Sequence, residues 1–177
     1  GSNRSQEDRD YVTFLNSYAT EQFKIPKSLI EFHTDCPYIE IKKYLKESSF
    51  GINAMWNEHF GIAVVEYVAS GLIPLVHASA GPLLDIVVPW DTSKTEQVKL
   101  NTTETRTGFF FKDKTDPDFR DSTADGKYPD LSELFVTATN LTDEEKFSIS
   151  KRGRECVLLK FSYLKFNQRW TEVLDQV

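Results

Sequence analysis

The sequence predicts an α/β fold, a Rossmann-like domain with a mostly parallel sheet flanked by helices. Three short apolar segments, 50–54, 73–77 and 108–111, have the composition of buried strands. The stretches around them contain apolar residues at helical spacing, and strands that alternate with helices are typical of a parallel sheet. The chain has 177 residues, the size of one domain with its own core. We therefore expect a single domain over residues 1–177.

The first third of the chain predicts two helices with a strand between them. Residues 7–22 carry aromatic side chains at helical spacing after an acidic start, and Pro26 ends that helix. Residues 29–33 alternate loosely between apolar and polar side chains and predict a strand. Pro37 opens the second helix, which we expect to reach residue 46.

The middle of the chain predicts the centre of the sheet. The strand at 50–54 is followed by a helix over 59–70 that closes at a glycine, and then by the strand at 73–77. Ser79–Pro82 has the residues of a turn, and 85–88 predicts a further short strand or its approach.

Two polar stretches and three helices are expected in the C-terminal half. Residues 90–106 and 112–129 lack periodicity, so they predict loop insertions on either side of the strand at 108–111. A helix is expected over 128–139, and Thr142 opens a capping box for a second helix to about residue 160. The last helix, from about residue 163, carries five apolar residues that we expect in the core: Leu164, Phe166, Trp170, Val173 and Leu174.

Composition excludes several classes of protein. The net charge is −6 and the basic residues are scattered, so we expect no nucleic-acid partner. Cys36 and Cys156 are the only cysteines and lack metal-ligand spacing, so we interpret them as free thiols. No run of 18 apolar residues occurs, so we expect this segment itself to be soluble.

The segment from Trp56 to Glu66 is the most informative part of the chain. It places Glu58 and Glu66 eight positions apart around Gly61, at the expected junction of a strand and a helix. A loop with glycine at a helix start can hold a phosphate, because the first backbone N–H groups of the helix are unpaired. Carboxylates accept hydrogen bonds from vicinal sugar hydroxyls, as they do with ribose in dinucleotide folds. The pattern therefore predicts a nucleotide-sugar site.

Plainer interpretations remain open for these residues. Glu58 could do no more than favour the helix dipole as a first-turn carboxylate, and Glu66 could be a solvated helix residue. His59 is a candidate base or metal ligand by residue type, but the three histidines lack ligand spacing, so we expect no metal.

The same segment resembles the donor-binding half of a retaining glycosyltransferase of the two-Rossmann-domain (GT-B) type, in the large family with a Glu-x7-Glu motif (glycosyltransferase family 4). The resemblance rests on Met55–Ile62, Val64–Glu66, Gly81–Pro82 and Leu84–Pro89. It is dense over residues 50–89 and thinner elsewhere. The chain has Ser79-Ala80-Gly81-Pro82-Leu83 where the branch of the family that it resembles in particular usually has Ser-Gly-Gly-Pro-Lys.

The resemblance implies a role for each matching residue. Glu58 would be the catalytic residue, which meets the hydroxyls of the transferred sugar, and Glu66 would hold the ribose. The other implied donor-binding residues are His59, Phe60, Gly61, Ile62 and Gly81. The reaction would need neither metal nor cofactor.

The chain resembles one branch of the family in particular, and that branch implies a more specific function. Its members transfer mannose from GDP-mannose in α-1,2 linkage to a dolichol-linked oligosaccharide, in asparagine-linked glycosylation at the cytosolic face of the endoplasmic reticulum. The implied acceptor domain, membrane segment and diphosphate-binding basic pair have no match in this chain, so we expect it to be inactive alone. The alternatives are the donor domain of another retaining GT-B enzyme and a non-catalytic scaffold domain.

Overall fold

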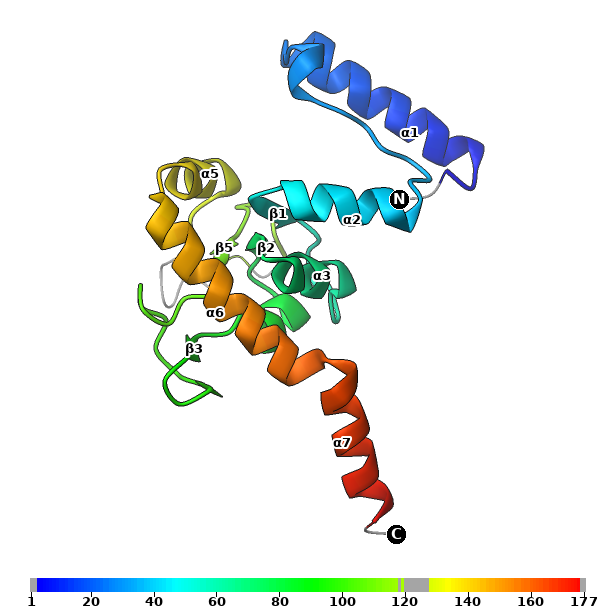
Figure 1. Cartoon of the computed structure of the whole chain (residues 1–177). Coiled ribbons are helices and arrows are strands. Elements are labelled where there is room, and N and C mark those ends of the chain that lie inside the picture. Colours follow the sequence, from blue (N-terminus) through cyan, green and yellow to red (C-terminus); the bar gives the residue numbers. More distant parts are fainter. Residues whose placement is uncertain (1–2, 118, 120–127, 176–177) are drawn as a thin grey trace. The chain divides into compact units, whose positions relative to one another are not determined.

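The computed structural model describes residues 3–117, 119 and 128–175 (Figure 1). Contacts divide the chain into two compact units, residues 1–44 and 45–177. The organisation of residues 1–177 as one domain stays a prediction, and each unit is described by itself.

The first unit is built around helix α1, Gln6–Ser17, which continues as a π-helical turn over Tyr18–Gln22. Ser5 caps α1 through a hydrogen bond that its hydroxyl accepts from the Asp8 N–H, as a capping box requires. The chain then forms a 3₁₀ turn, Lys27–Leu29, and enters helix α2, Tyr38–Glu47, whose last three residues belong to the second unit. Both predicted helices are confirmed.

The strand predicted at 29–33 is wrong. Ile30 is extended, with φ −140° and ψ 134°, but no strand among the described residues pairs with this segment. Loose alternation favours extended backbone, whereas a strand also needs a partner for its N–H and C=O groups.

The second unit contains the predicted parallel sheet. Its strands are β1 (Phe50–Asn53), β2 (Ile73–His77) and β5 (Phe109–Phe111), in the order β1–β2–β5. Both pairings are parallel, and every residue of the central strand β2 is buried. Trp90–Asp91 (β3) and Glu96–Gln97 (β4) form a small antiparallel pair inside the first polar insertion.

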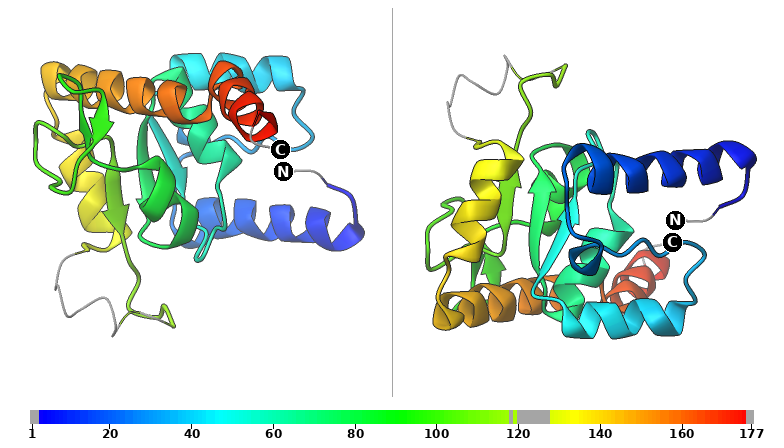
Figure 2. Two further views of the ribbon diagram at one scale, coloured as in Figure 1. Left: turned by 90° about the horizontal axis from the view of Figure 1, so that it is seen from below. Right: turned by 90° about the horizontal axis from the view of Figure 1, so that it is seen from above.

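Helices cover both faces of this sheet (Figure 2). They are α3 (Ile62–Ser70), α5 (Leu131–Thr139) and α6 (Asp143–Phe161). The last helix, α7 (Tyr163–Leu174), follows α6 and has no buried residue. Because side chains alternate along a strand, Leu75 and Val76 of β2 face opposite ways. Leu75 packs in a cluster with α5, and Val76 packs in one with α3. Thr142 caps α6 in a capping box, as the sequence predicts.

Three details of the second unit differ from the expectations. Helix α3 begins at Ile62 rather than 59, because Gly61 has a left-handed φ of 96°. Pro82–Ile86 is a π-helical turn where a strand was expected near 85–88. The five apolar residues expected in the core on α7 are exposed, Leu164 by 80% and Trp170 by 55%.

Two further findings concern the cysteines and the membrane. Both cysteines are free, as expected, and burial raises the pKa of Cys156 to about 11. Within residues 3–117, 119 and 128–175, none of the helices combines the length and the apolar character that a membrane span needs.

Candidate functional site

The chain segments that follow the three parallel strands make the candidate site. Residues 54–61 follow β1, residues 78–81 follow β2, and residues 112–117 follow β5. Parallel strands end at the same edge of their sheet, and ligands of open α/β sheets bind beyond that carboxyl edge. The site motif therefore lies where the fold places ligands.

The loop over residues 54–61 ends in an unpaired helix N-terminus. Two of its residues, Asn57 and Gly61, have left-handed backbone with φ of 55° and 96°. The Gly61 carbonyl accepts hydrogen bonds from the N–H groups of Val64 and Val65, at 2.9 and 3.1 Å. The first N–H groups of α3, those of Ile62 and the residue after it, have no acceptor in the part of the chain that the structure describes. They can receive an anionic group.

Gly81 joins the second loop to the first. Its N–H donates to the Glu58 carbonyl at 3.0 Å. A Cβ atom at position 81 would lie 2.4 Å from the Phe60 carbonyl oxygen and 2.5 Å from that of His59. Gly81 is thus needed for backbone contact between two loops, which the sequence alone did not indicate.

Glu58 and Glu66 lie on either side of the start of α3, and both are partly buried. Glu66 is four residues beyond Ile62, which corresponds to about 6 Å along the helix axis. The pKa of the neighbouring Tyr67 is raised by burial and, secondarily, by the negative charge of Glu66. A partly buried position differs from the fully solvated one of the plainer interpretation of Glu66.

His59 and Phe60 are exposed at the tip of this loop. The Phe60 ring meets Phe161 edge-on, with 5.4 Å between ring centroids. It lines a largely apolar cavity of about 410 Å³ that α3, α6 and α7 border. The Phe60 side chain is therefore engaged in apolar contact, whereas the donor contact that the resemblance implies for Phe60 is one of its backbone N–H.

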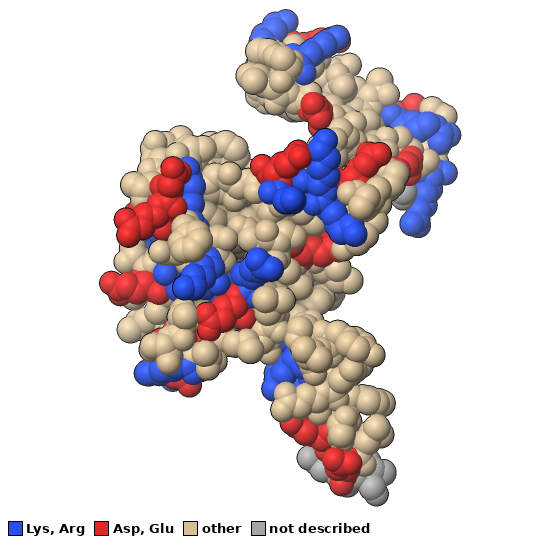
Figure 3. Space-filling view, in the orientation of Figure 1, with Lys and Arg blue, Asp and Glu red and all other residues tan. Residues whose placement is uncertain are grey.

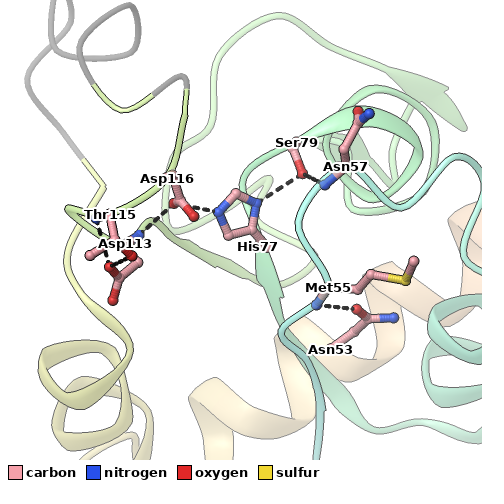
Figure 4. A network of polar contacts seen from close by, with 8 residues as sticks. All are labelled: Asn53, Met55, Asn57, His77, Ser79, Asp113, Thr115 and Asp116. Carbon is pink, nitrogen blue, oxygen red and sulfur yellow. Dashed lines mark hydrogen bonds and ion pairs between the residues drawn. The ribbon is translucent and has the colours of Figure 1, made fainter.

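A buried polar network, which the sequence reasoning missed, adjoins these loops (Figure 4). His77, the last residue of β2, lies 2.8 Å from the Ser79 hydroxyl and 2.7 Å from the Asp116 carboxylate. The Ser79 oxygen also accepts the backbone N–H of Asn57 at 2.8 Å. One sequence signal existed, since a histidine that ends a wholly apolar strand needs buried partners.

Ala80 carries the backbone strain of the second loop, with a left-handed φ of 42°. An L-residue with a Cβ pays about 1 kcal/mol or more in this region, which glycine avoids. We expect Ala80→Gly to relieve this strain and so to raise the free energy of unfolding. The increase should not exceed about 1 kcal/mol, because glycine also gains conformational freedom in the unfolded chain, which opposes it. Urea denaturation would measure it. Ala69→Gly, inside α3, is the control and should lose about 1 kcal/mol; equal losses in both variants would contradict the prediction.

Charge is mixed over the one face of the molecule that Figure 3 draws. Lys and Arg alternate with Asp and Glu over the face drawn in Figure 3, and no field of one sign dominates it. No cluster of three or more His, Cys, Asp or Glu that could hold a metal ion occurs among the described residues.

Comparisons with known proteins give one close group of relatives. The chain is 61% identical, over 99% of its length, to a GDP-Man:Man(3)GlcNAc(2)-PP-Dol alpha-1,2-mannosyltransferase of Eremothecium gossypii, and covers 30% of that protein. It spans about a third of the length of the curated relatives that it matches first. No protein-family model matches the chain.

Solved structures give the same fold. The chain superposes on Anabaena HepE with a TM-score of 0.66 and 15% identity, over 97% of this chain and 38% of that one. It superposes on the C-terminal domain of a group 1 glycosyl transferase (LpcC) of Francisella tularensis with a TM-score of 0.57 and 18% identity, over 90% and 66%. The predicted fold, a parallel sheet flanked by helices as in the C-terminal half of a GT-B glycosyltransferase, is confirmed.

Proposed function

Because this chain belongs to the glycosyltransferase family of the mannosyltransferases that it matches, we propose that it binds the nucleotide-sugar donor GDP-mannose. The observation that carries the proposal is the unpaired N-terminus of α3, set between Glu58 and Glu66 at the carboxyl edge of a parallel sheet.

Each residue at this edge receives a role in the proposal. The N–H groups of Gly61 and Ile62 bind the diphosphate, where they offset charge on the leaving GDP without reorganisation. Glu66 accepts hydrogen bonds from the ribose hydroxyls, and Glu58 accepts them from the mannose. His59 and the Phe60 N–H contact the donor from the loop tip, and Gly81 holds that loop in place. The proposed reaction needs no metal or cofactor.

The whole protein is proposed to transfer mannose with retention of configuration. Its acceptors would be dolichol-diphosphate-linked Man3GlcNAc2 and Man4GlcNAc2, joined in α-1,2 linkage. The E. gossypii relative's name specifies a GDP-Man donor and a Man(3)GlcNAc(2)-PP-Dol acceptor. An acceptor domain and a membrane-associated segment outside this chain would place the reaction at the cytosolic face of the endoplasmic reticulum.

The test replaces the matching segment of the E. gossypii relative with this chain. At 61% identity, we expect most contacts with the rest of that protein to be retained in the chimera. We expect the chimera to transfer mannose from GDP-mannose to a Man3GlcNAc2 lipid acceptor and to ignore UDP-glucose. Calorimetric titration of the 177-residue chain with GDP, GDP-mannose and UDP-glucose tests the donor site directly.

A matched pair of variants locates the binding site. We expect Glu66→Ala to weaken GDP binding, and Glu96→Ala, on the exposed strand β4, to leave it unchanged. Preference for UDP-glucose would assign the chain to another donor within the family. A folded chimera that transfers no mannose, together with a chain that binds none of the three ligands, would favour a scaffold and refute the proposal.

A further inference from the structure

Three side chains, two of them buried and the third largely buried, connect the ends of β2 and β5 to the loop that carries Glu58. They are His77, Ser79 and Asp116, called here the His77 brace. His77 is 3% exposed and Ser79 8%, and the Asp116 side chain is 11% exposed. Asp116 is 39 residues from His77 in sequence, so the brace exists only in the folded chain.

Hydrogen positions in the brace follow from the chemistry of its members. An ionised carboxylate can only accept, so we assign the hydrogen on His77 Nε2 to the bond with Asp116. In a neutral imidazole, Nδ1 then accepts from the Ser79 hydroxyl. The Ser79 oxygen in turn accepts the Asn57 N–H. Every donor therefore meets an acceptor, as a buried polar network requires.

The far end of the brace is held by its own turn. The Asp113 N–H donates to the same Asp116 oxygen at 2.7 Å. The Asp113 carboxylate accepts hydrogen bonds from the hydroxyl and the N–H of Thr115, and these two bonds lower its pKa. The turn thus presents the Asp116 carboxylate in a fixed position to His77.

The near end of the brace acts on the donor loop. Asn57 has a left-handed φ of 55°, a conformation that asparagine adopts more readily than most non-glycine residues but that is still less stable than the right-handed one. The bond from its N–H to Ser79 helps to hold the backbone in this conformation. The next residue, Glu58, offers its side chain to the proposed donor, and its carbonyl accepts the Gly81 N–H. The orientation of Glu58 therefore depends on the bond at Asn57.

We propose that His77 is a positioning residue of the donor site, which fixes the loop over residues 54–61 through Ser79 and is itself fixed by Asp116. The inference rests on the function proposed above for that loop. In this proposal the segment after β5 supports the donor site through His77 and Ser79, and Asp116 itself need not contact the donor.

Hydrogen exchange of the Asn57 amide in the 177-residue chain tests the brace without a ligand. We expect Asp116→Ala to speed this exchange by about fivefold or more, because loss of the carboxylate frees His77 and weakens the Ser79 bond. Asp116→Asn keeps an acceptor oxygen for both bonds and should exchange nearly as the parent does. Equal exchange in the parent and in Asp116→Ala would overturn the inference.

Kinetics of the chimera test positioning against plain stability. Ser79→Ala should raise the KM for GDP-mannose by about fivefold or more through the displaced loop. Thr107→Val is the matched control, since its hydroxyl makes one buried hydrogen bond to the Val88 carbonyl at 2.8 Å outside the loops at the carboxyl edge. It should lose similar stability and keep its KM. If the Ser79→Ala chimera and the parent chimera were both active with equal KM values, the inference alone would be overturned. If the parent chimera did not use GDP-mannose, the proposed function would be overturned, and the role of the brace with it.

Discussion

A Gly81→Ala variant should lose about 3 kcal/mol of unfolding free energy and all measurable binding of GDP-mannose. The added Cβ would lie 2.4 Å from the Phe60 carbonyl oxygen, 2.5 Å from that of His59 and 2.6 Å from the Phe60 Cα. All three atoms are backbone, so no side-chain rotation relieves the overlap. The loop would have to move, and its bond from Gly81 N–H to the Glu58 carbonyl would break with it.

The backbone conformation of Gly81, taken alone, predicts that Gly81→Ala raises the free energy of unfolding instead of lowering it. Gly81 has a helical φ of −55° and ψ of −48°, where alanine is normally better than glycine by about 1 kcal/mol. A lower free energy of unfolding in Gly81→Ala would therefore be due to the overlap between the two loops and not to the backbone conformation of residue 81. Urea denaturation and calorimetric titration with GDP-mannose measure the two effects.

Gly71→Ala is the control for this variant. Gly71 ends α3 with a left-handed φ of 92°, so alanine there should cost about 1 kcal/mol and leave donor binding intact. A Gly81→Ala variant that is more stable than the parent and binds the donor normally would show that the two loops do not touch as described.

The parts of the fold that depend on local signals could be predicted from the sequence. The strand at 73–77 was predicted with its exact bounds, because a continuous apolar run is typical of a strand buried on both faces. The helix after Thr142 was predicted from its capping box, which forms as expected.

Elements that depend on distant partners could not be predicted in the same way. Residues 29–33 have the alternation of a strand, but no strand partner exists for them among the described residues. The apolar residues of α7 are at helical spacing, yet this spacing does not show whether a surface is present to cover them. Pattern gives the conformation of such segments, and only the folded chain shows what they contact.

The residues of the candidate site likewise fall into those that local sequence signals indicate and those that depend on distant partners. Glu58, Gly61 and Glu66 belong to one contiguous motif and could be selected from residue type and spacing. The hydrogen bond between His77 and Asp116 joins segments that follow different strands, so no local pattern indicates it. The same holds for Gly81, whose neighbours in space come from the other loop.

Glu58→Gln in the chimera should lower mannose transfer about 100-fold without a change in thermal stability. The proposed role of Glu58 is to accept hydrogen bonds from the mannose hydroxyls, and weakening two charge-assisted bonds raises the barrier by about 3 kcal/mol. Glutamine keeps the size of the side chain. Since the described residues give the Glu58 carboxylate no ion pair, the folded chain should tolerate the change.

Glu66→Gln provides the contrast, because its proposed contacts are with the ribose, which is distant from the reacting bond. We expect it to raise the KM for GDP-mannose about tenfold and to leave kcat nearly unchanged, since such contacts stabilise ground state and transition state alike. Steady-state kinetics separate the two effects, with Glu96→Gln on β4 as the neutral control. If both variants raised KM with an unchanged kcat, Glu58 would be a binding residue only. If Glu58→Gln had no effect, its carboxylate would serve the dipole of α3 and not the sugar.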